Sequence, residues 1–573
     1  MKKATAFGAD EKKPIPVFGI DLGTTNSAIS VISQGNEAKT ITLVSGKKTM
    51  PSCILWKDGE FVVGDEAYQN RWKENAVYSV KRLMQRPNGY VKVKDNGTEA
   101  TFTPAEISAE ILKGLVKQTG GVYGEIKDVV VTVPAYFDQN GINATKQACE
   151  LAGLNLIAIA NEPTAASLNY HLNPEDGEVK DVVVYDLGGG TFDASLLRIT
   201  DSDDTESELA AIYGGDIANS NSKHSVIALS IRGDMRLGGD DIDDELLRIV
   251  LEKLAASGVP TKKIPAQYLE QMKLRLERYK KDSVNAQYEL NVNVTGINGR
   301  PITGKCTLHP EDFLAASMVI FKRTQKILDE LLASAPNNVD TIVLTGGSTK
   351  NPWIQQALQT TYPNFRIDNA LSPDLSVSQG AAIQGKITKF GDETIQIFDV
   401  LPLTIGALVE NGKVEPIIPG ASPLPVTRTM SFTTQYDNQE AVSVKLMQGN
   451  SVEAYNCISL GKLTIDGITP KKAGEADLKV TISINANRFM KCVAKIDGIE
   501  RELQVDLSGE TEVVDVSEME KTLIRLSRAG ALMSAENKER LDTMISVVRD
   551  TGDMSRVQEI KQFIRDNRNE AIS

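Results

Sequence analysis

The chain has 573 residues, of which 41% are hydrophobic and 24% are charged, a composition typical of globular proteins of about three to four domains. A net charge of −13 argues against nucleic acid as the main partner. The five cysteines are scattered without a C-x-x-C pair. We therefore expect their side chains to be buried and the protein to belong to a reducing compartment. No apolar run reaches the roughly 18 residues of a spanning helix, so we expect a cytoplasmic protein that does not contact a membrane.

Up to about residue 390, short β-branched runs alternate with segments of helical periodicity. The runs that predict buried strands are 17–20, 29–32, 129–133, 182–184 and 342–344. The segments that predict helices are 104–118, 139–152, 243–256 and 267–282. This alternation favours an α/β architecture with helices layered on sheets.

After residue 400 the pattern changes to closely spaced strands with turn residues between them, at 427–434, 441–448, 478–485 and 489–496. We therefore expect a separate β domain. In the last stretch, a capping box at 517–520 and apolar residues at helical spacing between 541 and 564 predict two or three short helices. The polar insertion 201–223, with its acidic run, predicts a solvated loop.

One motif occurs twice, as FGIDLGTTNS at 18–27 and as VVYDLGGGTFD at 183–193. In each copy the glycines allow backbone amides to approach an anion, and Asp21 or Asp186 follows a strand, where it could hold hydrated Mg²⁺. Either copy alone would be an ordinary hairpin turn, but the repetition indicates a duplicated half-domain. A third glycine turn, in IVLTGGSTKNP at 342–352, is either a base and ribose contact or a plain strand-to-helix turn.

In this order the three segments resemble the superfamily of actin, sugar kinases and heat-shock chaperone ATPases, in which two similar lobes clamp a nucleotide. Further segments narrow the resemblance to the 70-kilodalton heat-shock chaperones of the DnaK type: SVKRL at 79–83, VTVPAYF at 131–137, NEPTAA at 161–166, GDMRLGG at 233–239 and DVLPLTIG at 399–406, with 433–439 and 459–461. The resemblance extends from about residue 16 to about residue 510. It implies a flexible N-terminus (1–15), an actin-like ATPase domain (16–392), a linker (393–400), a peptide-binding β-sandwich (401–510) and a short helical lid (511–573).

The resemblance also implies a catalytic group. Lys81 would hold the attacking water, Glu162 and Asp186 would position water and Mg²⁺, and Thr191 would contact the γ-phosphate. The residues near Mg²⁺ and K⁺ would be Asp21, Asp186 and Asp193. The implied nucleotide contacts are Gly23, Thr24, Thr25, Asn26, Gly188, Gly189, Gly190, Gly239, Glu277, Lys280, Gly346, Gly347 and Lys350. Without the resemblance, Glu277 and Lys280 would be read as a surface pair on one helix.

In the implied sandwich, Val442 falls on the central pocket for an extended client segment, and Phe432 and Thr433 lie in the adjoining strand. Glu410 and Gln435 align with the two residues that arch over the peptide. The resemblance implies that the linker docks on the ATPase with ATP bound and comes free after hydrolysis; its apolar character favours such docking over the alternative, a featureless hinge. The linker residues that would couple the two sites are Ile395, Ile397, Phe398 and Asp399.

The chain departs from the family pattern at several positions. Ala158 stands where the family has an arginine that receives the acid of a J-domain, which weakens the expected J-domain partnership. Lys350 replaces an arginine that stacks on adenine, and Val284, beside Ser283, replaces a serine. About 60 residues follow the implied sandwich, fewer than the usual lid, and the 201–223 insertion has no family counterpart.

The function that follows is that of a monomeric, ATP-dependent chaperone of the heat-shock and stress response. It would use ATP or ADP with Mg²⁺ and K⁺, and would bind unfolded polypeptide, a J-domain co-chaperone and a nucleotide exchange factor. Hydrolysis would switch the sandwich between fast and slow peptide exchange. The alternatives are a small-molecule kinase and an actin-like scaffold on the same fold.

Overall fold

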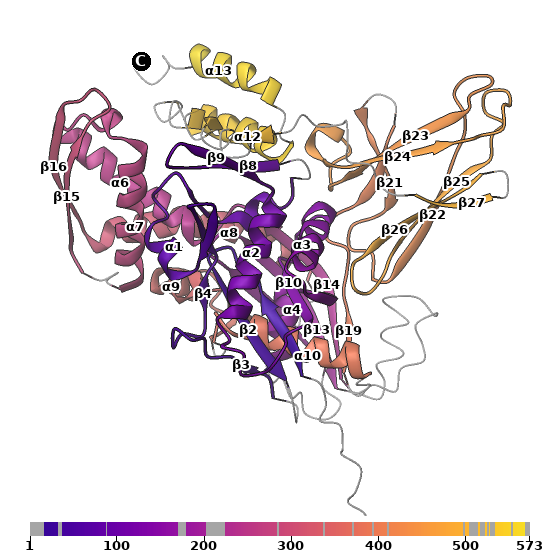
Figure 1. The fold of residues 1–573 in the computed structure, drawn as a ribbon, viewed down its shortest axis with the longest axis horizontal. Coiled ribbons are helices and arrows are strands. Elements are labelled where there is room, and N and C mark those ends of the chain that lie inside the picture. Colours follow the sequence, from indigo (N-terminus) through magenta and orange to yellow (C-terminus); the bar gives the residue numbers. More distant parts are fainter. Residues whose placement is uncertain are drawn as a thin grey trace, which may run out of the picture.

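The computed structural model describes residues 16–32, 37–86, 89–169, 179–201, 224–282, 286–335, 339–369, 372–391, 395–409, 412–496 and 499–503, and parts of 514–567. Over these residues it confirms a mixed α/β fold (Figure 1). The five cysteines are buried, as expected, and are free of disulfide bonds. No described helix has the length and apolar character needed to cross a membrane.

The first large sheet, called the first sheet below, is built around the strand that carries the first glycine motif. Its order is β11-β10-β1-β2-β3, with β4 also paired to β2. β1 runs parallel to β10 and antiparallel to β2. The strands are β1 (Val17–Asp21), β2 (Asn26–Ile32), β3 (Lys39–Thr40), β4 (Met50–Pro51), β10 (Asp128–Val133) and β11 (Asn155–Asn161).

The second large sheet, called the second sheet below, has the order β18-β17-β12-β13-β14-β19. Its β12 runs antiparallel to β13 and parallel to β17, which repeats the pairing of β1 with β2 and β10. The last strand, β19, adds in parallel to β14. The strands are β12 (Val179–Leu187), β13 (Phe192–Asp201), β14 (His224–Asp234), β17 (Thr341–Thr345), β18 (Arg366–Asp368) and β19 (Ile395–Phe398).

Amphipathic helices cover these sheets and bury their apolar sides in separate cores. The expected helix at 243–256 begins earlier, at Gly239, because the Asp241 carboxylate accepts the amide of Gly238 (2.7 Å) and closes the first turn. The helices are α1 (Asp65–Gln69), α2 (Pro104–Lys117), α3 (Gln139–Leu151), α4 (Glu162–Asn169), α6 (Gly239–Ala256), α7 (Ala266–Asp282), α8 (Pro310–Leu332), α9 (Pro352–Thr361) and α10 (Ser376–Phe390).

Small antiparallel sheets extend the outer parts of this region. They are formed by β5 (Cys53–Lys57), β6 (Glu60–Val63) and β7 (Ala76–Tyr78), by β8 (Gly89–Asp95) and β9 (Thr98–Phe102), and by β15 (Tyr288–Thr295) and β16 (Pro301–Leu308). A short 3₁₀ helix, η1 (Val80–Leu83), follows β7, and a second, η3 (Gly347–Lys350), follows β17.

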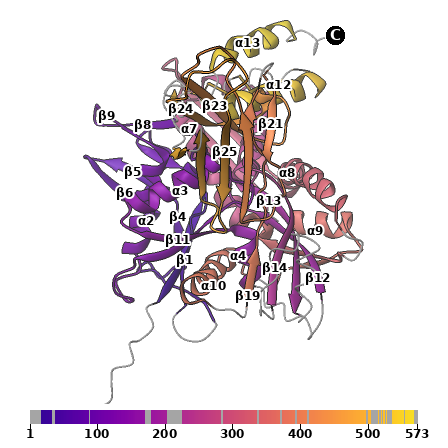
Figure 2. The same ribbon diagram turned by 90° about the vertical axis from the view of Figure 1, so that its right-hand side faces the viewer.

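After β19 the chain forms two four-stranded antiparallel sheets, called the paired small sheets below (Figures 1 and 2). Alternate residues of both sheets, among them Leu446, Leu463 and Val480, meet in one buried core, as the period-two pattern requires. One sheet has β21 (Val414–Ile418), β20 (Ile405–Leu408), β23 (Ala441–Gln448) and β24 (Ile458–Asp466). The other has β22 (Val426–Phe432), β25 (Leu478–Ile484), β26 (Met490–Ile496) and β27 (Ile499–Leu503).

The C-terminal helices are α12 (Ala535–Thr551) and α13 (Val557–Asp566), and their apolar residues form a core of their own that includes Leu541 and Ile560. A two-residue strand, β28 (Val514–Asp515), pairs in parallel with β8, while α12 contacts β24. The C-terminal segment therefore touches both the first region and the paired small sheets. The expected capping box at 517–520 and residues 202–223 of the insertion lie outside the described residues.

Candidate functional site

The two glycine motifs lie against each other, each in the turn between two strands of a large sheet. A Cβ atom on Gly189 would lie 1.8 Å from Thr25 Oγ1, and one on Gly190 would lie 2.4 Å from Thr24 Cγ2. Only glycine leaves room for these threonine side chains so close to the backbone. The Thr25 hydroxyl is buried and has no hydrogen-bond partner among the described residues, so this contact leaves a polar group available to a ligand.

The third glycine turn joins the same place from β17. Gly346 has a φ of +81°, and a Cβ there would lie 2.4 Å from Asp186 Oδ1. The hydroxyl of Ser348 in η3 donates to the Gly188 carbonyl (2.8 Å). The expected contact Gly239, at the start of α6, lies under the same serine: a Cβ on it would be 2.3 Å from Ser348 Oγ. The expected residues Gly23 and Asn26 lie in the first turn.

Three aspartates lie at strand ends beside these turns. Asp21 and Asp186 end β1 and the corresponding part of β12, and Asp193 lies opposite Asp186 in the β12–β13 register. Asp21 accepts the Thr132 hydroxyl (3.1 Å), and Asp193 accepts the amides of Ala135 (3.1 Å) and Tyr136 (3.2 Å). The structure thus brings together the carboxylates that sequence alone left far apart.

Lys81 and Glu162 complete this group. Lys81 comes from η1 and Glu162 from the first turn of α4, and their buried side chains form an ion pair. Thr191 is also buried, at 6% exposure. We call Asp21, Glu162, Asp186 and Asp193 the carboxylate cluster.

The carboxylate cluster carries more negative charge than its surroundings balance. Burial and the nearby Glu162 carboxylate raise the pKa of Asp21 and of Asp193 to about 7. The pKa of Asp186 is raised well above its ordinary value by burial and by Glu162 and Asp193. Their oxygen atoms are of the kind that Mg²⁺ prefers, but among the described residues no three acidic, histidine or cysteine side chains are arranged to hold a metal ion directly.

Glu277 and Lys280 on α7 are not a simple surface pair. Glu277 is 2% exposed, and Lys280 donates to Asp243 (2.7 Å) and to the carbonyl of Gly239 (2.6 Å) at the start of α6. Glu277 accepts instead from Lys281 (2.6 Å). The interpretation from helical spacing alone is wrong, since tertiary contacts bury the carboxylate.

Arg71 is a residue that the sequence analysis missed. Its guanidinium lies 2.6 Å from Glu277 and above the rings of Tyr68 (4.8 Å) and Tyr78 (5.2 Å). Although burial opposes it, Arg71 with Lys281 and Lys280 lowers the pKa of Glu277 to about 2. Arg71 follows α1 and Glu277 lies on α7, so this ion pair joins the region of the first sheet to that of the second. No local sequence pattern predicts this ion pair.

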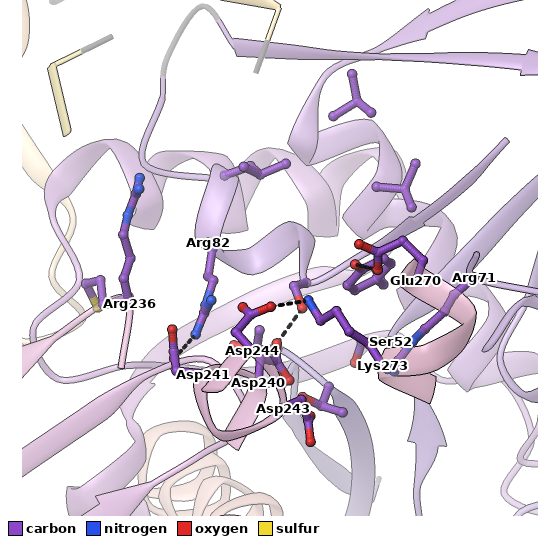
Figure 3. Close-up of a pocket in the computed structure, with 18 of the residues that line it drawn as sticks. Ser52, Arg71, Arg82, Arg236, Asp240, Asp241, Asp243, Asp244, Glu270 and Lys273 are labelled. Atoms are coloured by element: carbon purple, nitrogen blue, oxygen red, sulfur yellow. Dashed lines mark hydrogen bonds and ion pairs between the residues drawn. The ribbon is translucent and has the colours of Figure 1, made fainter. Parts of the chain in front are cut away.

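Arg82 makes a second cross-connection that was missed, although it directly follows Lys81. It donates to the Gly190 carbonyl (2.8 Å) and to Asp241 on α6 (2.8 Å), and Ser79 donates to Asp240 (2.8 Å). Figure 3 shows Arg82 directed at Asp241, beside Asp240. A charged residue next to a candidate lysine, in a segment already singled out, was the available signal.

A cleft of about 1880 Å³ opens between these elements. Thr24 and Thr25 of the first turn line it, as do Arg71 and five acidic residues of α6. Figure 3 shows part of this wall, with Lys273 of α7 paired to Asp244 (2.8 Å). Among the other expected contacts, Lys350 is exposed and paired with Asp374, whose Oδ1 also approaches Gly347. Ser283 and Val284 lie outside the described residues.

The expected linker residues lie in a strand of the second sheet. Ile395 and Ile397 are half-buried in β19, opposite His224 and Val226 of β14, and Phe398 is buried. Asp399, directly after β19, accepts from Asn161 (2.5 Å) and pairs with Arg488 (3.0 Å).

The expected peptide-binding residues lie on the paired small sheets. Val442 and Phe432 are half-buried against their core, and Thr433 and Gln435 are exposed. Glu410 lies outside the described residues. Tyr436, next to Gln435, is 71% exposed and was not anticipated.

Together, the facing glycine turns and the carboxylate cluster define an α/β protein with a candidate site for a phosphate and a divalent cation. The family model described as Hsp70 protein matches residues 17–205 and 221–572, and the chain belongs to this family. The unmatched residues 206–220 fall within the insertion that had no counterpart. Relatives named chaperone protein DnaK include those of Mycoplasmoides gallisepticum, 34% identical over 92% of this chain and 86% of the relative, and Metamycoplasma hominis, 32% identical over 95% and 88%. A third, from Deinococcus deserti, is 31% identical over 95% and 86%.

Proposed function

We propose that this Hsp70-family chain is an ATP-dependent chaperone whose linker strand reports the state of the nucleotide site to a peptide-binding β-sandwich. The observation that carries the proposal is the position of β19. It is the outermost strand of the sheet whose β12 and β13 carry Asp186 and Asp193. A change at the carboxylate cluster can therefore reach the linker through three hydrogen-bonded strands.

The two large sheets and their helices are assigned to the two lobes of an actin-like ATPase domain, residues 16–392, which converts ATP and water to ADP and phosphate. The facing turns at Thr25 and Gly189 would hold the phosphates, with Glu277 and Lys280 on the adenosine side. Lys81, oriented by its ion pair with Glu162, would hold the attacking water. Positioning and charge neutralisation of this kind supply most of the rate enhancement in phosphoryl transfer.

The cations are assigned from the chemistry of the buried ligands. Asp21, Asp186 and Asp193 would hold Mg²⁺, directly or through water, and K⁺ beside it. These residues would hold Mg²⁺ where it would supply positive charge to the phosphate oxygens. The raised pKa values of these aspartates support the assignment, because a bound cation would favour their charged forms.

The paired small sheets are assigned to the client-binding sandwich, residues 401–510. An extended polypeptide would lie near Val442 and Phe432, held by main-chain hydrogen bonds. Residues 393–400 would be the linker and 511–573 a short lid. The chaperone would act as a cytoplasmic monomer with a J-domain partner and an exchange factor, and the J-domain contact would differ at Ala158, which is fully buried on β11.

Release of a fluorescent peptide from the purified protein, with ATP or ADP added, tests the proposal. ATP should accelerate release strongly relative to ADP. Equal rates with the two nucleotides would contradict it. Phosphorylation of a sugar or polyol would favour the kinase, and sedimentation that depends on concentration without phosphate release would favour the scaffold.

A further inference from the structure

A buried arginine occupies the hairpin turn between β25 and β26. Arg488 is 2% exposed and has a φ of +64°, a left-handed conformation that costs energy for any residue except glycine. The turn is closed by the Arg488 amide, which donates to the Asn485 carbonyl (2.9 Å). Burial of the charge and strain of the backbone both cost free energy, so contacts outside the turn must stabilise Arg488 in this position.

Its contacts lie at the end of the linker. Arg488 Nε donates to Asp399 (3.2 Å), and a terminal nitrogen lies 3.0 Å from Asp399 and donates to the Val400 carbonyl (2.9 Å). The side chains are 3% and 13% exposed. Among the described residues, Arg488 is the cation paired with Asp399.

The same pair touches the region of the first sheet. Asn161 at the end of β11 donates to Asp399, and Gln139 of α3 donates to the Arg488 carbonyl (3.5 Å). Beside it, the Gln139 amide donates to Gln448 of β23 (2.8 Å). The next residue after Gln139, Asn140, donates to the carbonyl of Ser459 on β24 (3.0 Å). The ion pair therefore lies where the ATPase region, the linker and the paired small sheets meet.

We propose that Arg488 is the positioning residue that allows the Asp399 carboxylate to be buried at this junction, so that it sets the balance between docked and free linker. The inference deepens the proposed coupling and rests on it. When β19 leaves β14 and the junction opens, water solvates Asp399. When the linker docks, the carboxylate loses that water, and without Arg488 it would be a buried, unpaired charge. Loss of Arg488 thus penalises only the docked state.

Neighbouring cations do not share this role. Lys491 on β26 pairs with Glu502 (2.8 Å), but both side chains are more than half exposed, and such surface pairs contribute little. Ala158, which the sequence analysis singled out, is an apolar core residue and offers no charge.

The test is hydrogen exchange of the linker amides, Ile395–Phe398, in the full chain with and without ATP. Arg488→Gly keeps the turn folded, because glycine favours its positive φ, and should accelerate linker exchange at least tenfold. Adding Asp399→Asn to that variant removes the unpaired charge and should restore most of the protection. Lys491→Ala should exchange like the unsubstituted protein.

Unchanged linker exchange in Arg488→Gly would overturn the inference, and so would a double variant that exchanges as fast as the single one. The peptide-release assay keeps the two proposals apart. If ATP fails to release peptide from the unsubstituted protein while the exchange pattern holds, the proposed function falls and the role of Arg488 stands.

Discussion

Replacing Arg71 by methionine should accelerate the release of bound nucleotide. The guanidinium of Arg71, which lines the cleft, pairs with Glu277 at 2.6 Å, with side-chain exposures of 9% and 3%. Methionine keeps apolar volume between the rings of Tyr68 and Tyr78 but removes the charge. Because Arg71 follows α1 and Glu277 lies on α7, a motion that separates the regions of the two large sheets must break this pair.

The size of the effect follows from the surroundings of Glu277. Removing one partner of a buried ion pair costs about 3–5 kcal/mol when the other is left alone. Here Glu277 keeps Lys281 at 2.6 Å, so the loss is closer to that of one charge-assisted hydrogen bond, about 1.5–3 kcal/mol. At about 1.4 kcal/mol for each factor of ten, the closed cleft should open roughly ten- to a hundredfold more often.

The assay is stopped-flow release of a fluorescent ADP analogue, chased with unlabelled ADP. The matched control is Lys73→Met, because Lys73 is a nearby exposed cation that lies over the Trp72 ring. The control should release nucleotide at the unsubstituted rate. If Arg71→Met releases ADP within twofold of that rate, the ion pair does not hold the cleft closed.

Three further predictions concern the catalytic group, the linker and the dependence of the free energy of unfolding on pH in the acid range. Lys81→Ala should lower the single-turnover hydrolysis rate by about 10²-fold or more while ATP still binds, since one preorganised donor is lost; an undiminished rate would contradict its role. Asp399→Asn should abolish the stimulation of ATP hydrolysis by peptide, and intact stimulation would refute the linker proposal. The folded-state pKa of Glu277, about 2, lies below its ordinary value of 4.5, so its stabilising contribution is complete above pH 4.5 and is lost as the pH falls towards 2. Denaturant titrations of Glu277→Gln should therefore show a shallower loss of stability over that range, and an identical slope would argue against the shift.

The strands and helices around the site could be predicted because their signals are local. The β-branched runs before Asp21 and Asp186 indicate buried strands, and the repeated glycine motif indicates that two similar turns exist. The contact between Gly189 and Thr25 is consistent with that duplication, because two similar half-domains can place their equivalent turns face to face. Glu277 was placed at the nucleotide by family resemblance, whereas its helical spacing alone indicated a surface position.

The contacts that join distant segments could not be predicted in this way. Arg71 and Arg488 lie in loops. Neither the hydrophobic periodicity of the sequence nor its composition indicates which carboxylate each arginine pairs with. The same holds for β28: the two residues Val514 and Asp515 carry no strand pattern of their own, and only the edge of β8 gives them a partner. Such contacts depend on how whole layers pack, which a local pattern does not report.

The parallel addition of β19 to β14 also has a cost when it is undone. A strand that loses its outer neighbour exposes a row of unsatisfied amides and carbonyls, which is a template for aggregation. A molecule with its linker detached thus exposes the unpaired edge of β14. Extended, misfolded client chains nearby could pair with that edge. In the attached form, Ile395–Phe398 cover the edge of β14. The linker strand therefore also protects the protein against aggregation through that edge.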